Sequence, residues 1–396
     1  MGKLCMTLPP FSPDYSGVCS ALFPFDALTV LHDASGCTGN YTGYDEARWF
    51  RSRSPIYCSG LREIDAILGD DEKLIQKVLY ALEDVKPEII ALVGSPVPMV
   101  IGADMEGIAA EIESRTGIMS VGFATTGIRY YPQGIEMVYK NVVQRILKED
   151  ETEAVREENT VNIFGATPID FGRSNTIEDL TKLLADNGIK VNQALWENVK
   201  KSDVVQLKNA ACNIVVSHAG IALAEYMKKH YGIPYVTELP YGECYAFLWL
   251  EKLKKVMANT CKESYQPVKK EEYNESAQAK ILIIGEQLQC NSIRNAIWAE
   301  TKEVCDVAGI CGWDTRFAKA NDSFLESEAE IERSLNDEKY DCIIGDPLYQ
   351  DLLHAKKNFY EVAHYAVSSK IANEKAISLI GKNISHLKNL SLTDFS

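Results

Sequence analysis

One cysteine occupies a position where a ligand side chain is expected. Cys37 follows the apolar run ALTVL at 27–31, in the segment SGCTGNYTGY, and the glycines around it free the backbone for a turn. Ligands of open α/β sheets bind at the carboxyl ends of the strands. An inert core thiol, a redox partner and a metal ligand are the three roles open to Cys37.

Two other thiols lie near Cys37 in the sequence. Cys19, 18 residues earlier, sits in the apolar run GVCSALF, which favours a core position. Cys58, 21 residues later, follows a short strand-like run and is the better candidate for a second ligand. The 11 cysteines of the chain include no CxxC pair, so nothing local supports a zinc ribbon, a thioredoxin-like site or a ferredoxin-type cluster.

Two histidines and one arginine are candidates for a second chemical site. His218 follows the apolar run CNIVVS, His364 lies in FYEVAHYAV, and Arg129 lies at a predicted strand end in TTGIRYYPQG. An imidazole can bind a metal or carry a proton, and a guanidinium group matches a carboxylate bidentately. The ordinary alternatives are a histidine satisfied within the core and an arginine in a salt bridge.

The rest of the chain predicts the framework that positions these residues. Short apolar runs alternate with amphipathic helices in three successive blocks. Strands that are apolar throughout indicate parallel sheets covered on both faces. We therefore expect an α/β protein with three Rossmann-like domains, at 1–158, 159–272 and 273–396, the last ending in helices. The polar stretch 261–278 has the composition of a linker.

Charge and composition restrict the partners. The net charge is −15 and no cluster of Lys and Arg occurs, which argues against binding to nucleic acid or to anionic membranes. The sequence has no apolar run long enough to span a bilayer and its beginning lacks the apolar core of a signal peptide, so we expect a cytoplasmic protein. The segment IIGEQLQCNS carries no nucleotide-binding glycine motif, so this chain is not expected to bind ATP or NAD.

Several separated stretches carry a family resemblance. CSALFPFDALTVLHDASGCTGNYTGY, LGDDEKL, VIGADMEG and GFATTGIRYYPQGIEMVY resemble, in this order, the first domain of nitrogenase component 1-type proteins. NIVVSHAGIALAEYMKKHYGIPYVTELPYG resembles the second domain of that family. The resemblance covers most of the chain.

The resemblance implies an iron–sulfur oxidoreductase. Two related chains, either a sister chain or a second copy, hold a [4Fe–4S] or related cluster between them, and an ATP-dependent iron protein supplies electrons. Cys37 occupies the position of a cluster ligand. Two other ligand positions of the family carry Ser12–Pro13 and Ser95-Pro96 here, so the resemblance implies few thiolates per chain. A symmetric pair using Cys37 and Cys58 from each copy would provide four.

The resemblance also bears on a second cofactor. The family's cofactor cysteine would fall at about Val216–Ser217, with His218 the nearest potential ligand, and His364 lies roughly where the cofactor histidine would be. We expect electrons to pass to a substrate or second metal centre near His218, His364 and Arg129. Two alternatives stay open: a scaffold on which a metal cofactor is assembled, and a protein that binds a metal chelate or tetrapyrrole without redox chemistry.

Overall fold

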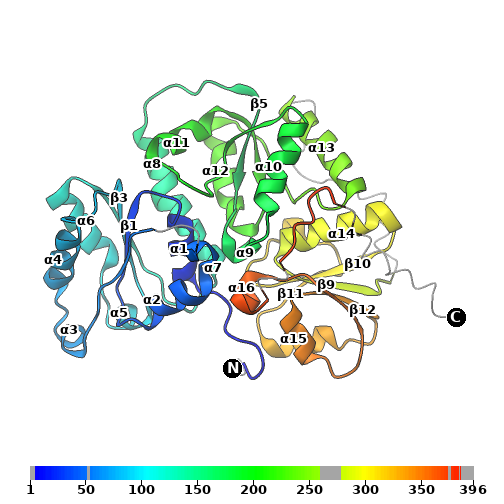
Figure 1. Cartoon of the computed structure of the whole chain (residues 1–396), viewed down its shortest axis with the longest axis horizontal. Helices are drawn as coiled ribbons and strands as arrows, with labels where there is room; N and C mark the ends of the chain where they lie inside the picture. The colour runs from blue at the N-terminus through cyan, green and yellow to red at the C-terminus, as the bar shows by residue number, and fades with distance from the viewer. Residues whose placement is uncertain (1–4, 51–53, 259–277, 373–375, 383, 385–396) are drawn as a thin grey trace.

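The strands form three separate parallel sheets. The structure, a computed structural model, describes residues 5–50, 54–258, 278–372, 376–382 and 384. Each sheet has helices against its faces, and the three units meet around a common centre (Figure 1). The predicted α/β class with three Rossmann-like domains is confirmed. The predicted linker at 261–278 lies almost entirely outside the described residues, and the predicted domain boundaries stay predictions.

The first unit contains the sheet that carries Cys37 and Cys58. Its strand order is β2 (Ile56–Cys58), β1 (Ala27–Leu31), β3 (Ile89–Val93), β4 (Met119–Phe123). Every residue of the last three strands is buried, because α4 (Asp71–Ala81) and α6 (Met105–Thr116) cover one face while α1 (Asp14–Leu22) and α7 (Tyr131–Val138) cover the other. This two-sided burial is the reason the strands are apolar throughout.

The second unit is built on the strand order β6 (Lys190–Gln193), β5 (Glu157–Phe164), β7 (Ala210–Val215), β8 (Tyr235–Thr237). All of its strand pairs are parallel. Its helices and the helix leading into it are α8 (Gln144–Glu149), α9 (Pro168–Phe171), α10 (Thr176–Asp186), α11 (Lys201–Gln206), α12 (Ile221–Tyr231) and α13 (Glu243–Met257).

The third unit is built on the strand order β11 (Ser323–Phe324), β10 (Cys305–Gly309), β9 (Ile281–Gly285), β12 (Cys342–Gly345), β13 (Asn358–Glu361), again parallel. Its helices are α14 (Gln287–Thr301), α15 (Glu328–Leu335) and the short α16 (Tyr365–Ser368). None of the helices in the described part of the chain combines the length and the apolar character needed to cross a membrane.

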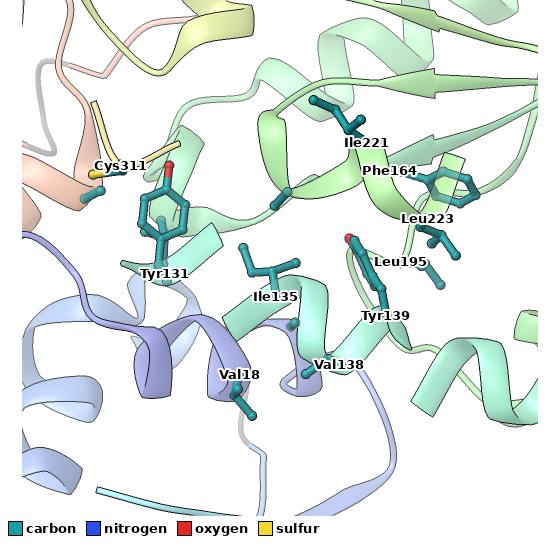
Figure 2. Packing of buried hydrophobic residues seen from close by; sticks show 14 of the residues in the cluster. Val18, Tyr131, Ile135, Val138, Tyr139, Phe164, Leu195, Ile221, Leu223 and Cys311 are labelled. Carbon is teal, nitrogen blue, oxygen red and sulfur yellow. The ribbon is translucent and has the colours of Figure 1, made fainter. Parts of the chain in front are cut away.

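Helix α7 connects the first unit to the other two. It crosses α1 so closely that a Cβ on Gly134 would lie 1.9 Å from the carbonyl oxygen of Asp14, and a Cβ on Gly17 would lie 2.0 Å from that of Tyr131. Only glycine permits this approach. Figure 2 shows Val18 of α1 below α7, and Ile135 between α7 and the second unit. The crossing therefore sets where α7 presents its side chains to the centre.

Candidate functional site

Cys37 lies on a turn at the carboxyl edge of the first sheet. It is the second residue of α2 (Gly36–Asn40), which follows β1, and it is half-buried. The Oδ2 atom of Asp33 accepts hydrogen bonds from the backbone N–H groups of Ser35 and Thr38, each at 3.0 Å. Ser35 has a φ of 136°. Asp33 therefore holds the turn that displays the thiol.

Cys58 lies beside the same turn. It ends β2 and pairs in register with Leu31 of β1, and its side chain is exposed. Its sulfur donates to the carbonyl oxygen of Asp33 at 3.3 Å and accepts from the backbone N–H of Gly60 at 3.4 Å. Cys37 and Cys58 thus flank Asp33 at one edge of the sheet, and the Cys58 sulfur lies close enough to influence the ionisation of Cys37.

The surroundings of Cys37 disfavour a free thiolate. Burial raises the pKa of its thiol, Asp33 and Cys58 add to the rise, and a hydrogen bond with Tyr15 opposes it. Burial also raises the pKa of Tyr15 above its ordinary range, so the phenol stays protonated and can donate to the sulfur. A cysteine in this setting ionises when a positive charge compensates it, and a metal ion provides that charge.

The two cysteines fit part of an iron–sulfur ligand set. Such clusters are held by thiolates, commonly four, and hydrogen bonds to the sulfurs tune their potential; Tyr15 and Gly60 are donors of this kind. Among the described residues, no group of three or more His, Cys, Asp and Glu side chains is arranged to hold a metal ion. Two thiolates are half of a four-thiolate set.

Two helices near the edge that carries Cys37 and Cys58, called the cysteine edge below, expose large apolar side chains. Helices α3 (Glu63–Leu68) and α5 (Pro96–Val100) follow β2 and β3 and lie at the same end of the first sheet as α2 (Figure 1). Their large apolar side chains are exposed: Ile64 56%, Ile67 71%, Leu68 70%, Val97 49% and Val100 86%. We call these five residues the edge patch. Large exposed apolar side chains gathered on helices at one end of a sheet are compatible with an interaction surface.

Cys19, Ser12 and Ser95, which the sequence analysis considered as ligand positions, do not supply ligands at the cysteine edge. Cys19 is fully buried in α1, and burial raises the pKa of its thiol well above the ordinary value. The Ser12 hydroxyl donates to Asp45 Oδ1 at 3.1 Å, and the Ser95 hydroxyl donates to the carbonyl oxygen of His32 at 2.9 Å. Cys19 is thus placed as a core thiol, and both serines serve internal hydrogen bonds.

His364 lies where the three units meet. It precedes α16, is 6% exposed, and its Nε2 atom lies 3.3 Å from the hydroxyl oxygen of Tyr131 on α7 and 3.6 Å from Oδ1 of Asp170 on α9. Tyr131 donates its hydroxyl proton to the same Oδ1 atom. Helices α7, α9 and α16 converge there in Figure 1. We call Tyr131, Asp170 and His364 the junction triad.

His218 lies on another side of the same junction. Its Nδ1 atom is 3.6 Å from Oε1 of Glu136 on α7, and its ring packs against Gly312 of the third unit, where a Cβ would come within 2.9 Å. Burial lowers the pKa of His218 and raises the pKa of Glu136 to about 7. The structure therefore brings both candidate histidines against α7, with one contact near each end of that helix.

From the sequence, no chemical role is assigned to Glu286 or to the other two triad members. The backbone N–H of His218 donates to Oε1 of Glu286 at 2.8 Å, and that of Gln289 donates to Oε2 at 2.8 Å. Burial, followed by the nearby charge of Asp170, raises the pKa of Glu286 to about 8. Asp170 and Glu286 each follow a buried strand, so position at a strand end was the available signal.

Arg129 is not at the junction. It is exposed and lines a cavity of about 220 Å³ with the N-terminal segment and the start of α15. Glu328 of α15 holds that segment, because its carboxylate accepts from the backbone N–H groups of Met6, Thr7 and Leu8. The structure therefore separates Arg129 from the two histidines with which it was grouped.

Comparison with known proteins defines the class. A sequence model of the nitrogenase component 1 type oxidoreductases matches residues 14–312, more than half of the chain. The protein belongs to this family, as its motifs indicated. Two solved structures named Nitrogenase Cp1, at pH 6.5 and at pH 5, share the fold with TM-scores of 0.56 and 0.55 at 16% identity. They cover 91% and 95% of this chain, and the match covers 70% and 79% of theirs.

Individual curated relatives are distant. The chain is 22% identical over 214 residues to one subunit of the light-independent protochlorophyllide reductase of Nostoc punctiforme, covering 52% of this chain and 42% of that protein. It is 27% identical over 184 residues to the corresponding subunit from Cycas taitungensis, and this match covers 44% of this chain and 35% of that protein. The chain thus spans less than half the length of these relatives.

Proposed function

We propose that the protein is a subunit of a nitrogenase-like reductase in which Cys37 and Cys58 hold one half of an iron–sulfur cluster, [4Fe–4S] or related. The observation that carries the proposal is the placement of two sulfur atoms around Asp33 at one sheet edge. The other ligands come from a second copy of the chain or from a homologous sister chain. The oxygen sensitivity of such a cluster suits a cytoplasmic, anaerobic setting.

The edge patch supports the two-chain arrangement. The helices that carry its five exposed apolar side chains lie at the same end of the first sheet as α2, and covering these side chains with a partner would remove apolar area from water while closing the cluster site. Tyr15 and the Gly60 N–H would donate to the ligand sulfurs. When bound, the cluster would supply one-electron transfer. The chain's own residues would bind it, exclude water and adjust its potential.

Electrons in this proposal arrive from an ATP-dependent iron protein and leave toward the junction. His364 and His218 are the groups proposed to face a substrate or second metal centre, because both are held against α7 at the meeting point of three units. Arg129 lies in a separate cavity, so we leave it out of the proposed site. The family relationship supports oxidoreductase chemistry.

The test is anaerobic purification of the wild type beside Cys37→Ala, Cys58→Ala and Cys19→Ala. We expect about four iron atoms per pair of chains for a [4Fe–4S] cluster, with a paramagnetic signal on reduction. Cys37→Ala should lose nearly all of this iron, Cys58→Ala most of it, and Cys19→Ala none, since Cys19 lies in the core. A wild type without iron, or a Cys37→Ala protein that keeps it, would overturn the proposal. A protein that releases its metal to an acceptor without turnover would be a scaffold.

A further inference from the structure

The junction triad joins one buried side chain from each unit. Tyr131 comes from α7 of the first unit, Asp170 from α9 of the second and His364 from the segment before α16 of the third. Their exposed fractions are 0%, 2% and 6%. The hydroxyl of Tyr131 lies between the other two, since it donates to Asp170 Oδ1 and contacts His364 Nε2 at 3.3 Å. Figure 2 shows Tyr131 leaving α7 toward Cys311 of the third unit.

The protons of this triad are fixed by counting donors. A phenol has one hydroxyl proton, and Tyr131 donates it to Asp170. Burial, together with Asp170, raises the pKa of Tyr131 well above its ordinary value, so that proton stays on the phenol. Toward His364, the Tyr131 oxygen can then act only as an acceptor. The Nε2 atom of His364 must therefore carry the proton, and a neutral ring then has a lone pair on Nδ1.

The backbone of His364 is held by a separate set of contacts. The backbone N–H of His364 donates to Oδ2 of Asp346 at 2.8 Å, and the hydroxyl of Ser368 donates to the same atom at 2.7 Å. Asp346 is 1% exposed and follows β12. The third unit thus holds the backbone of His364, while the first and second units determine its tautomer.

The Nδ1 atom of His364 has no partner in the part of the chain that the structure describes, although it is buried. A buried acceptor without a hydrogen bond is costly and calls for an explanation. Proteins present an imidazole to a ligand in this way: an oxygen partner holds one ring nitrogen, and the other nitrogen stays available.

We infer that Tyr131 and Asp170 are positioning residues that lock His364 in the Nε2–H tautomer, so that Nδ1 serves as an acceptor for an N–H or O–H group of a ligand at the junction. The assignment of that ligand as the substrate of the reductase rests on the proposed function. The tautomer itself does not depend on iron or on a partner chain.

The test is nitrogen NMR of the protein labelled in its six histidines, with His364 assigned by its loss in His364→Gln. In the wild type we expect the ring proton on Nε2 and a lone pair on Nδ1. In Asp170→Leu, the hydroxyl of Tyr131 loses its acceptor and turns to His364, so the proton should move to Nδ1 and the tautomer should invert. In Tyr131→Phe, Asp170 lies near enough to accept from Nε2 directly, so the tautomer should remain.

The outcomes separate a tautomer lock from a merely structural role. Equal tautomer populations in all three proteins, or a wild-type ring protonated at Nδ1, would overturn the inference even if Asp170→Leu does not fold, because the wild-type spectrum is decisive alone. Ammonium, which has N–H donors, and potassium, which has none, then serve as matched probes of Nδ1 as an acceptor. If the Nδ1 signal shifts with ammonium alone, the acceptor role is supported. If the two ions have the same effect, the acceptor role is contradicted. Iron content plays no part in either readout, so failure here is distinct from failure of the proposed function.

Discussion

The cysteine edge and the junction depart from the usual distribution of side chains in opposite ways. The edge exposes large apolar residues, Val100 at 86% and Ile67 at 71%, while the junction buries carboxyl and imidazole groups, Asp170 at 2% and His364 at 6%. Apolar residues are normally inside and ionisable residues outside. In the proposals above, each departure belongs to an interaction with a partner or a ligand. The edge exposes its apolar side chains to solvent, and Nδ1 of His364 has no hydrogen-bond donor among the residues that the structure describes.

The two sites are also held together over different distances along the chain. The edge is held by local segments, since Asp33, Cys37 and Cys58 fall within 26 residues of one another and pair through β1 and β2. The junction is held by residues 39 and 233 positions apart in the chain. We therefore expect the edge to respond to changes in association and the junction to respond to changes in the packing of the units.

The largest effect should come from charging the edge patch. The double variant Ile67→Asp, Leu68→Asp removes two exposed apolar side chains of α3, whose burial is worth about 3 kcal/mol together. Association of the chains should weaken about a hundredfold, as measured by anaerobic sedimentation. Tyr80→Asp on α4 is the matched control, because Tyr80 is 70% exposed but belongs to another helix. If the two variants associate equally well, the edge patch is not the surface through which the chains associate.

The next effect tests the packing that forms the junction. In Gly134→Ala the new methyl group would lie 1.9 Å from the Asp14 carbonyl oxygen, so α7 must move away from α1. We expect a loss of about 3 kcal/mol in the free energy of unfolding, measured by urea denaturation. Gly39→Ala is the control, since nothing lies within 4 Å of its added Cβ. A neutral Gly134→Ala would mean that the crossing does not position α7.

The smallest effect concerns pH and sharpens the description of the junction. Glu286 has its pKa raised from 4.5 to about 8 by burial, so between these values the folded chain binds more protons than the unfolded chain. The Glu286 contribution to stability is full below pH 4.5 and is lost as pH rises through about 8, with a slope on the order of 1 kcal/mol per pH unit.

Glu286→Gln should flatten this part of the stability profile. Urea unfolding midpoints measured between pH 4.5 and 8 test this expectation. Glu136→Gln provides the comparison, because the contribution of Glu136 to stability should be lost as pH rises through about 7. A profile that Glu286→Gln leaves unchanged would show that the carboxyl group is charged in the folded chain at neutral pH.

Much of the fold could be read from the chain. Apolar runs such as IIALV and ILIIG predicted buried parallel strands, and both are buried throughout in β3 and β9. The apolar run around Cys19 indicated a core thiol, where the structure has it. The junction could not be read in this way, because nothing in the local pattern of Tyr131 or Asp170 differs from that of a buried tyrosine or a helix-start acid.

The three α/β units and the position of Cys37 after a strand follow from local sequence, because periodicity and turn residues act over a few positions. The folded structure was needed to place Cys58 beside Asp33, through the pairing of β2 with β1. It also decided that Arg129 stands apart while Tyr131, Asp170 and His364 meet. Contacts between units depend on how helices such as α7 cross, and that crossing is set by the close approach at Gly17 and Gly134, the first of which lies against the backbone of Tyr131.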